Sequence, residues 1–181
     1  MRKKIYCAVP SSRSVSAIKS SAGNIDLSGA VRRGQECINA LRSVLPDIPS
    51  RCPYRRYHTW SNTWRVVFDL GVDVSDLAED YFDTNYDQDG SARKIMKDAQ
   101  DALWDDNVVV DEAKYQEAVD SYTNAYWGYI ETISNKCDTI CKEFSDDDYH
   151  CAFSYFNNET DKRIPPRHAT LSVYDKSYVN R

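Results

Sequence analysis

The longest regular pattern in the chain is "DEAKYQEAVDSYTNAYWGYIETISNKCDTICKEF", residues 111–144. Its apolar residues recur every three or four positions, which is the spacing of one stripe along a long α-helix. The stripe consists of Tyr115, Val119, Tyr122, Tyr126, Ile130, Ile133, Cys137, Ile140 and Phe144. We therefore expect a long amphipathic helix that forms the spine of the hydrophobic core.

Shorter helices are expected upstream of this stretch. Helical periodicity predicts them near residues 74–84 and 91–104, separated by a segment rich in Asn, Asp and Gly. Residues 28–45 place a further apolar stripe on one side of a helix, which the prolines at 46 and 49 end.

The remaining segments carry β-strand patterns. Residues 54–72 are rich in aromatic and β-branched residues and predict extended or hairpin structure, and residues 3–9 predict a first strand. The alternation within residues 149–181 predicts a C-terminal β-hairpin. The 181 residues, 41% of them apolar, are enough for one core. We expect a single α+β domain over residues 1–181, with a long amphipathic core helix, shorter acidic helices and a small antiparallel sheet.

The charges are unevenly distributed along the chain, whose net charge is −5. Residues 1–65 form a basic N-terminal part, with 12 Lys and Arg against 3 Asp and Glu. Residues 66–181 carry 11 against 25, and the excess of acid lies mainly in the helical part, residues 66–148. Such asymmetry indicates interaction with a charged partner, or two halves that face each other across one fold.

The acids of the short helices are spaced as rows. Asp76, Asp80, Asp83 and Asp87 are four, three and four residues apart, and Asp98, Asp101 and Asp105 repeat the pattern. At about 1.5 Å rise per residue, each row presents a carboxylate roughly every 4.5 to 6 Å, comparable with the charge spacing of a nucleic-acid backbone. The rows are therefore candidates for occupying a basic groove meant for DNA or RNA. The alternative is a solvated surface, on which Lys94 and Lys97 pair with Asp98 and Asp101.

The segment "FDTNYDQDGSARKIMKD", residues 82–98, resembles a calcium-binding EF-hand loop. With Asp83 in the first position, Gln88 occupies the position that needs glycine; with Asn85 there, Met96 replaces the closing glutamate. Since each register lacks an indispensable residue, we expect a turn between two helices.

The basic part contains a second candidate interface, "RCPYRRYHTWSNTWR" at residues 51–65. Arginines and aromatic residues alternate there, a mixture that contacts phosphates and stacks on bases, and that is also enriched at protein interfaces. The candidate contact residues are Arg55, Arg56, Trp60 and Trp64. Thirteen tyrosines in the chain also favour a recognition surface.

Cys137, Cys141, His150 and Cys151 include the residue types of a zinc site. His150 and Cys151 are adjacent, however, so on a strand they point to opposite faces. Packing of the thiols in the core is the favoured interpretation, and a zinc-containing metalloprotein remains an alternative.

No motif of a known enzyme class is present. The sequence has no Gly-rich phosphate loop, no G-x-S-x-G and no H-E-x-x-H, so we expect a protein that is not an enzyme and needs no cofactor. The N-terminus has too few apolar residues before Pro10 for a signal peptide, and no membrane-spanning run follows. We therefore expect a cytoplasmic location and reduced cysteines.

In size, charge layout and lack of enzyme motifs, the chain resembles the small proteins with which phages and mobile elements disable host nucleases. The family it resembles is the type II-A anti-CRISPR proteins. This resemblance implies an inhibitor that binds the complex of an RNA-guided nuclease and its guide RNA and blocks DNA loading, in some members by imitating DNA. It implies no direct nucleic-acid binding. The alternative is a nucleic-acid-binding module that uses residues 51–65.

Overall fold

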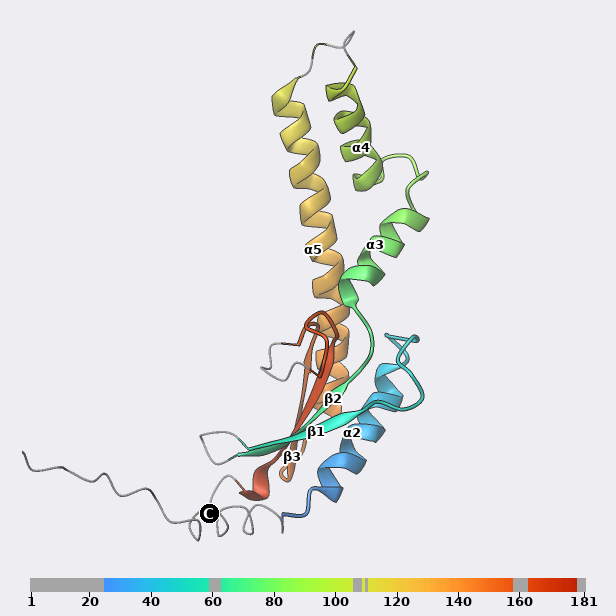
Figure 1. The fold of residues 1–181 in the computed structure, drawn as a ribbon. Helices are drawn as coiled ribbons and strands as arrows, with labels where there is room; N and C mark the ends of the chain where they lie inside the picture. The colour runs from blue at the N-terminus through green and yellow to red at the C-terminus, as the bar shows by residue number, and fades with distance from the viewer. Residues whose placement is uncertain (1–24, 59–62, 106–108, 110, 158–162, 179–181) are drawn as a thin grey trace, which may run out of the picture.

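The computed structural model describes residues 25–58, 63–105, 109, 111–157 and 163–178. Its elements are, in chain order, α2 (Ser28–Leu41), β1 (Tyr54–His58), β2 (Trp64–Asp69), α3 (Val74–Thr84), α4 (Ala92–Leu103), α5 (Glu112–Glu143), β3 (Tyr149–Ser154), β4 (Thr170–Asp175) and a short 3₁₀ helix, η1 (Lys176–Tyr178). The expected α+β fold is confirmed (Figure 1). The strand predicted at residues 3–9 lies outside the described residues.

The four strands form one antiparallel sheet in the order β1-β2-β4-β3. The pairing of β2 with β4 joins the hairpin of the basic part to the predicted C-terminal hairpin. One face of the sheet packs against α2 and the C-terminal part of α5 (Figure 1). The core between them includes Phe68, Leu171 and Val173 from the sheet and Leu41 and Cys137 from the helices.

Helix α2 carries a glycine, Gly34, at the point where it contacts the sheet. A Cβ atom on Gly34 would lie 2.2 Å from the Phe68 ring, well inside any permissible carbon contact. Phe68 is 1% exposed, so its ring has little freedom to move away. Gly34 therefore sets the distance between α2 and β2.

The N-terminal part of α5 extends away from the sheet, with α3 and α4 packed along it (Figure 1). At about 1.5 Å per residue, the 32 residues of α5 span about 48 Å. We call residues 73–131 the arm and the remaining residues the body. Within the described residues, no helix is both long and apolar enough to cross a membrane.

The arm has an aromatic cluster around Phe82, which joins the core of the body through Tyr126 and Tyr129. The Phe82 ring lies 5.4 Å from that of Tyr122 and 6.2 Å from that of Tyr129, and Tyr81 stacks on Tyr129 at 4.4 Å. Tyr126 also faces this cluster. The abundance of tyrosine in this region thus reflects packing between α3 and α5 and gives no support to a recognition surface.

Side-chain caps fix where the arm helices begin. Asp73 accepts a hydrogen bond from the Ser75 amide at 2.9 Å, and Ser91 accepts one from the Lys94 amide at 3.1 Å. Asp111 caps α5 in the same way. Each cap satisfies amide groups that the first turn of a helix leaves without a partner, so the helices begin close to the predicted positions.

Candidate partner-binding surface

The arm concentrates the negative charge of the chain. Residues 73–131 contain 16 Asp and Glu against 4 Lys and Arg, a net charge of −12. The rest of the chain carries 12 acids against 19 Lys and Arg, a net charge of +7. Among the described residues, the arm has 15 acids against 4 Lys and Arg, and the body has 10 against 12. Because the arm extends away from the sheet (Figure 1), its negative charge is separated in space from the nearly neutral described part of the body.

The first acidic row lies on the solvent side of α3 and, at Asp87, in the turn that follows this helix. Its four members, Asp76, Asp80, Asp83 and Asp87, are all exposed, while Val74, Ala78 and Phe82 are buried on the other side. Asp83 forms an ion pair of 2.8 Å with Arg93 of α4. Among the described residues, no ion pair involves the other three acids, so their charges remain available to a partner.

The second row is largely neutralised by its own helix. Lys94 pairs with Asp98 at 2.7 Å and Lys97 with Asp101 at 3.7 Å, as the spacing of the sequence predicts. Asp105, the third acid, is exposed. The acidic surface that a partner would meet is therefore mainly that of α3 and the following turn.

Among the described residues, no ion pair joins the basic part of the chain to the arm. The ion pairs described for α3, α4 and the start of α5 are all formed within the arm. The basic part meets the acidic part at the far end of α5, where Arg33 of α2 contacts Asp146 at 2.7 Å.

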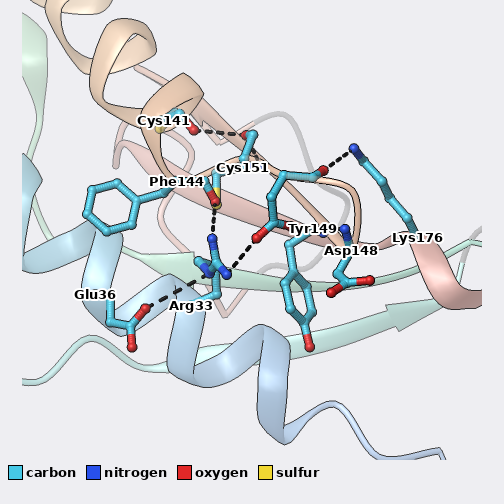
Figure 2. Close-up of polar contacts among 10 residues, drawn as sticks. Arg33, Glu36, Cys141, Phe144, Asp148, Tyr149, Cys151 and Lys176 are labelled. Atoms are coloured by element: carbon cyan, nitrogen blue, oxygen red, sulfur yellow. Dashed lines mark hydrogen bonds and ion pairs between the residues drawn. The ribbon is translucent and has the colours of Figure 1, made fainter.

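Figure 2 shows the network at this junction. Arg33 donates a 3.0 Å hydrogen bond to the carbonyl oxygen of Phe144, at the end of α5, and also approaches Glu36 at 3.9 Å. Its guanidinium lies 5.4 Å from the centre of the Tyr149 ring. The network holds α2, α5 and β3 together, and we assign it a structural role.

The segment that resembles an EF-hand is a turn between α3 and α4. Asn85 Oδ1, a ligand in both calcium registers, instead accepts a 2.7 Å hydrogen bond from Gln88 Nε2. Gly90 adopts a φ of 77°, which allows the chain to reverse. Among the described residues, no group of three or more His, Cys, Asp or Glu side chains is arranged to hold a metal ion.

The candidate contact residues of the basic part do not form one surface. Trp64 lies on the helix-covered face of the sheet, 4.6 Å from the His58 ring, and packs against the core. Arg55 is half-buried on the opposite face, whereas Arg56 is exposed. Trp60 lies outside the described residues.

A row of side chains that the sequence did not reveal crosses the outer face of the sheet. Tyr57, Arg65, Tyr174 and His150 occupy paired positions on four strands. The Arg65 guanidinium lies 5.6 Å from the Tyr57 ring and 5.4 Å from the Tyr174 ring, and donates a 2.8 Å hydrogen bond to Tyr174 Oη. The alternation of side chains around Tyr174 predicted a strand there, but not that this strand lies beside Arg65. The pairing of β2 with β4 joins residues far apart in the sequence, so no local pattern predicts it.

The proposed zinc ligands are divided between the two faces of the sheet. Cys137, Cys141 and Cys151 are buried in the core, where Cys141 Sγ lies 3.8 Å from Cys37 Sγ. His150 is exposed on the other face, beside the Tyr174 ring. Burial raises the pKa of the Cys137 thiol to about 12, so this sulfur is protonated at neutral pH.

No protein-family model, curated protein or solved structure matches this chain.

Proposed function

We propose that this protein is a protein-binding inhibitor of an enzyme that handles nucleic acid, and that its arm occupies the basic nucleic-acid groove of that enzyme. One observation carries the proposal: a net charge of −12 is concentrated in the residues of the arm, which extends away from the sheet (Figure 1). The arm presents the unpaired carboxylates of α3 at helical spacing. Opposite charges on two surfaces steer their encounter and fix their register.

The target class follows from the resemblance to type II-A anti-CRISPR proteins. In this proposal the partner is a nuclease loaded with guide RNA in the host cytoplasm, and the inhibitor blocks loading of target DNA. The chain acts as a stoichiometric inhibitor without catalysis, so its effect rises with its concentration until each nuclease complex has bound it.

A binding assay with a guide-loaded type II-A nuclease tests the proposal. We expect replacement of Asp76, Asp80 and Asp87 by Lys to weaken binding at least about tenfold, because it reverses three exposed carboxylates of the groove-binding surface. Asp83 is kept, since its pair with Arg93 supports the arm. Helical content by circular dichroism shows whether the arm remains folded.

The matched control reverses Asp47, Glu143 and Asp147 in the body, which are also exposed. It has the same net charge as the arm variant and should bind like the wild type. Target DNA loaded beforehand should prevent binding of the wild type. Equal binding to the DNA-loaded complex, or equal losses in the two variants, would refute the proposal.

A nucleic-acid-binding module is the second candidate, since Arg65 and the rings of Tyr57 and Tyr174 form a stacked group on the outer face of the sheet. Stacking of bases on such side chains is a common mode of single-strand recognition. A gel shift with generic single-stranded and duplex DNA separates the two candidates. Tight binding that Tyr57→Ala abolishes would favour this module, whereas an inhibitor should bind neither DNA tightly.

A further inference from the structure

A half-enclosed cavity of about 410 Å³ lies between α2 and the segment leading into β1. Its volume falls in the range of roughly 300–1,000 Å³ that small-molecule sites have. The residues that line it are Gln35, Ile38, Asn39, Arg42, Ser50, Arg51, Cys52 and Phe68. All of them belong to the body, so a ligand in this cavity is independent of the function proposed for the arm.

The wall of the cavity has the chemistry of an anion site. Arg42 and Arg51 supply two positive charges, and Ser50 adds a hydroxyl donor. Among the lining residues there is no carboxylate to compete with an anion for these donors. Arg side chains bind phosphate oxygens through paired N–H donors, which gives both energy and orientation.

Arg42 is held in place before any ligand arrives. Its Nε donates to the carbonyl oxygen of Ile48 at 3.3 Å, its Nη2 donates to that of Pro49 at 2.7 Å, and its Nη1 donates to Asn39 Oδ1. These bonds use three of the five N–H groups of the guanidinium and leave one on each Nη atom. A fixed guanidinium loses little conformational entropy on binding, which favours affinity.

The floor of the cavity is apolar and closely packed, and its rim is polar. Ile38 and Phe68 form it, at 3% and 1% exposure, and they close the cavity toward the core. Gln35 and Asn39 are exposed at the rim, and such amide side chains recognise the edges of bases. Burial raises the pKa of the Cys52 thiol, so at neutral pH this wall residue is uncharged and does not repel an anion.

We propose that this cavity binds a mononucleotide, with its phosphate on Arg42 and Arg51 and its base at the rim beside Gln35 and Asn39. Two arginines match a phosphate monoester, which carries about −1.5 to −2 charges at pH 7, better than a carboxylate with a single charge. The amide rim provides contacts for the base, which free phosphate lacks.

Titration calorimetry with AMP, adenosine and inorganic phosphate, each used separately, tests this assignment. AMP should bind at least about tenfold more tightly than either of its halves. Arg51→Ala and Gln35→Ala should each weaken AMP binding severalfold. Both residues are exposed, so neither variant should disturb the fold, whereas loss of Arg42 would also release the loop that it holds. Arg32→Ala is the matched control, because Arg32 is exposed on α2 and does not line the cavity.

A second measurement locates the ligand. Among the described cysteines, Cys52 is half-exposed and the other four are buried. Saturating AMP should therefore slow alkylation of Cys52 by iodoacetamide, as measured by peptide mass spectrometry. The assignment would be overturned if AMP, GMP, CMP and UMP all failed to bind at about 10 mM, a concentration above the dissociation constant of about 1 mM that marks weak binding. It would also be overturned if phosphate bound as tightly as AMP. Equal losses of AMP affinity in the Arg32 and Arg51 variants would overturn it as well.

Discussion

Gly128 and Gly90 both have open space where a side chain would stand, yet substitution should affect them in opposite directions. A Cβ atom at either position would meet no atom within 4 Å. Gly128 lies inside α5, where alanine is preferred to glycine by about 0.5–1 kcal/mol. We expect Gly128→Ala to raise the free energy of unfolding by about that amount, as measured by urea denaturation.

Gly90 is the matched comparison, because its φ of 77° lies in the left-handed region. A residue with a Cβ pays about 1–2 kcal/mol there, so Gly90→Ala should lower the free energy of unfolding. A stabilising effect at Gly90, or a destabilising one at Gly128, would show that the two backbone conformations differ from those described.

Asp146 should make the stability of the fold dependent on pH in the acid range. Its carboxylate accepts the amide hydrogens of Tyr149 at 2.8 Å and Asp148 at 2.9 Å and pairs with Arg33. The hydrogen bond from Tyr149 contributes most to lowering the pKa of Asp146 below its ordinary value of 3.8. A carboxyl whose pKa is lowered by folding stabilises the fold above its unfolded pKa and loses this effect as the pH falls through its folded pKa.

The variant Asp146→Asn tests this dependence, since it keeps the acceptor oxygen and removes the charge. It should be less stable than the wild type at pH 7 in urea denaturation, and the difference should shrink below about pH 4. Asp147→Asn is the control, because Asp147 is exposed and forms no ion pair with the described residues. A difference that persists unchanged to about pH 2 would contradict the role of the charge.

At the scale of elements, local signals predicted the helices and strands but not the order in which the strands pair. The apolar stripe of α5 and the caps at Asp73, Ser91 and Asp111 depend on neighbouring residues, so the sequence alone placed these helices within a few positions. The pairing of β2 with β4 brings Arg65 beside Tyr174, more than one hundred residues away. Nothing in either strand specifies this partner, because strand alternation fixes the face of a residue and not its neighbouring strand.

The same limit applies to the candidate surface. Helical spacing predicted a row of Asp76, Asp80, Asp83 and Asp87, and all four are exposed, but α3 ends at Thr84, so Asp87 lies in the following turn. The pair between Asp83 and Arg93 joins two helices, and it could not be found from spacing along one of them. Residue types alone also grouped His150 with the cysteines, although the sheet divides them.

The arm should unfold more readily than the body, because α4 has no buried residue and the arm depends on the cluster around Phe82. Phe82 is 7% exposed between α3 and α5, and its truncation to Ala should cost about 3–5 kcal/mol locally. We expect Phe82→Ala to speed amide hydrogen exchange in α3 and α4 while leaving β2 and β4 protected. Cys137→Ala, a truncation in the core of the body, should instead affect the sheet. Uniform loss of protection in both variants would mean that arm and body unfold together.

For the whole molecule, the separation of charge has a consequence that needs no partner to test. An ion-exchange surface senses charge within about a Debye length, roughly 10 Å at 0.1 M salt, so it responds to the most highly charged face more than to the net charge. The arm, with its net charge of −12, should therefore hold the protein on a positively charged resin more strongly than the net charge of −5 implies. The Lys variant of Asp76, Asp80 and Asp87 should elute at lower salt than the body control at Asp47, Glu143 and Asp147. Because both variants change the net charge by the same amount, their order of elution reports where the charge lies. If the two variants elute together, or the control elutes first, the acidic face of α3 does not dominate the field of the molecule, and the groove-binding proposal loses its physical basis.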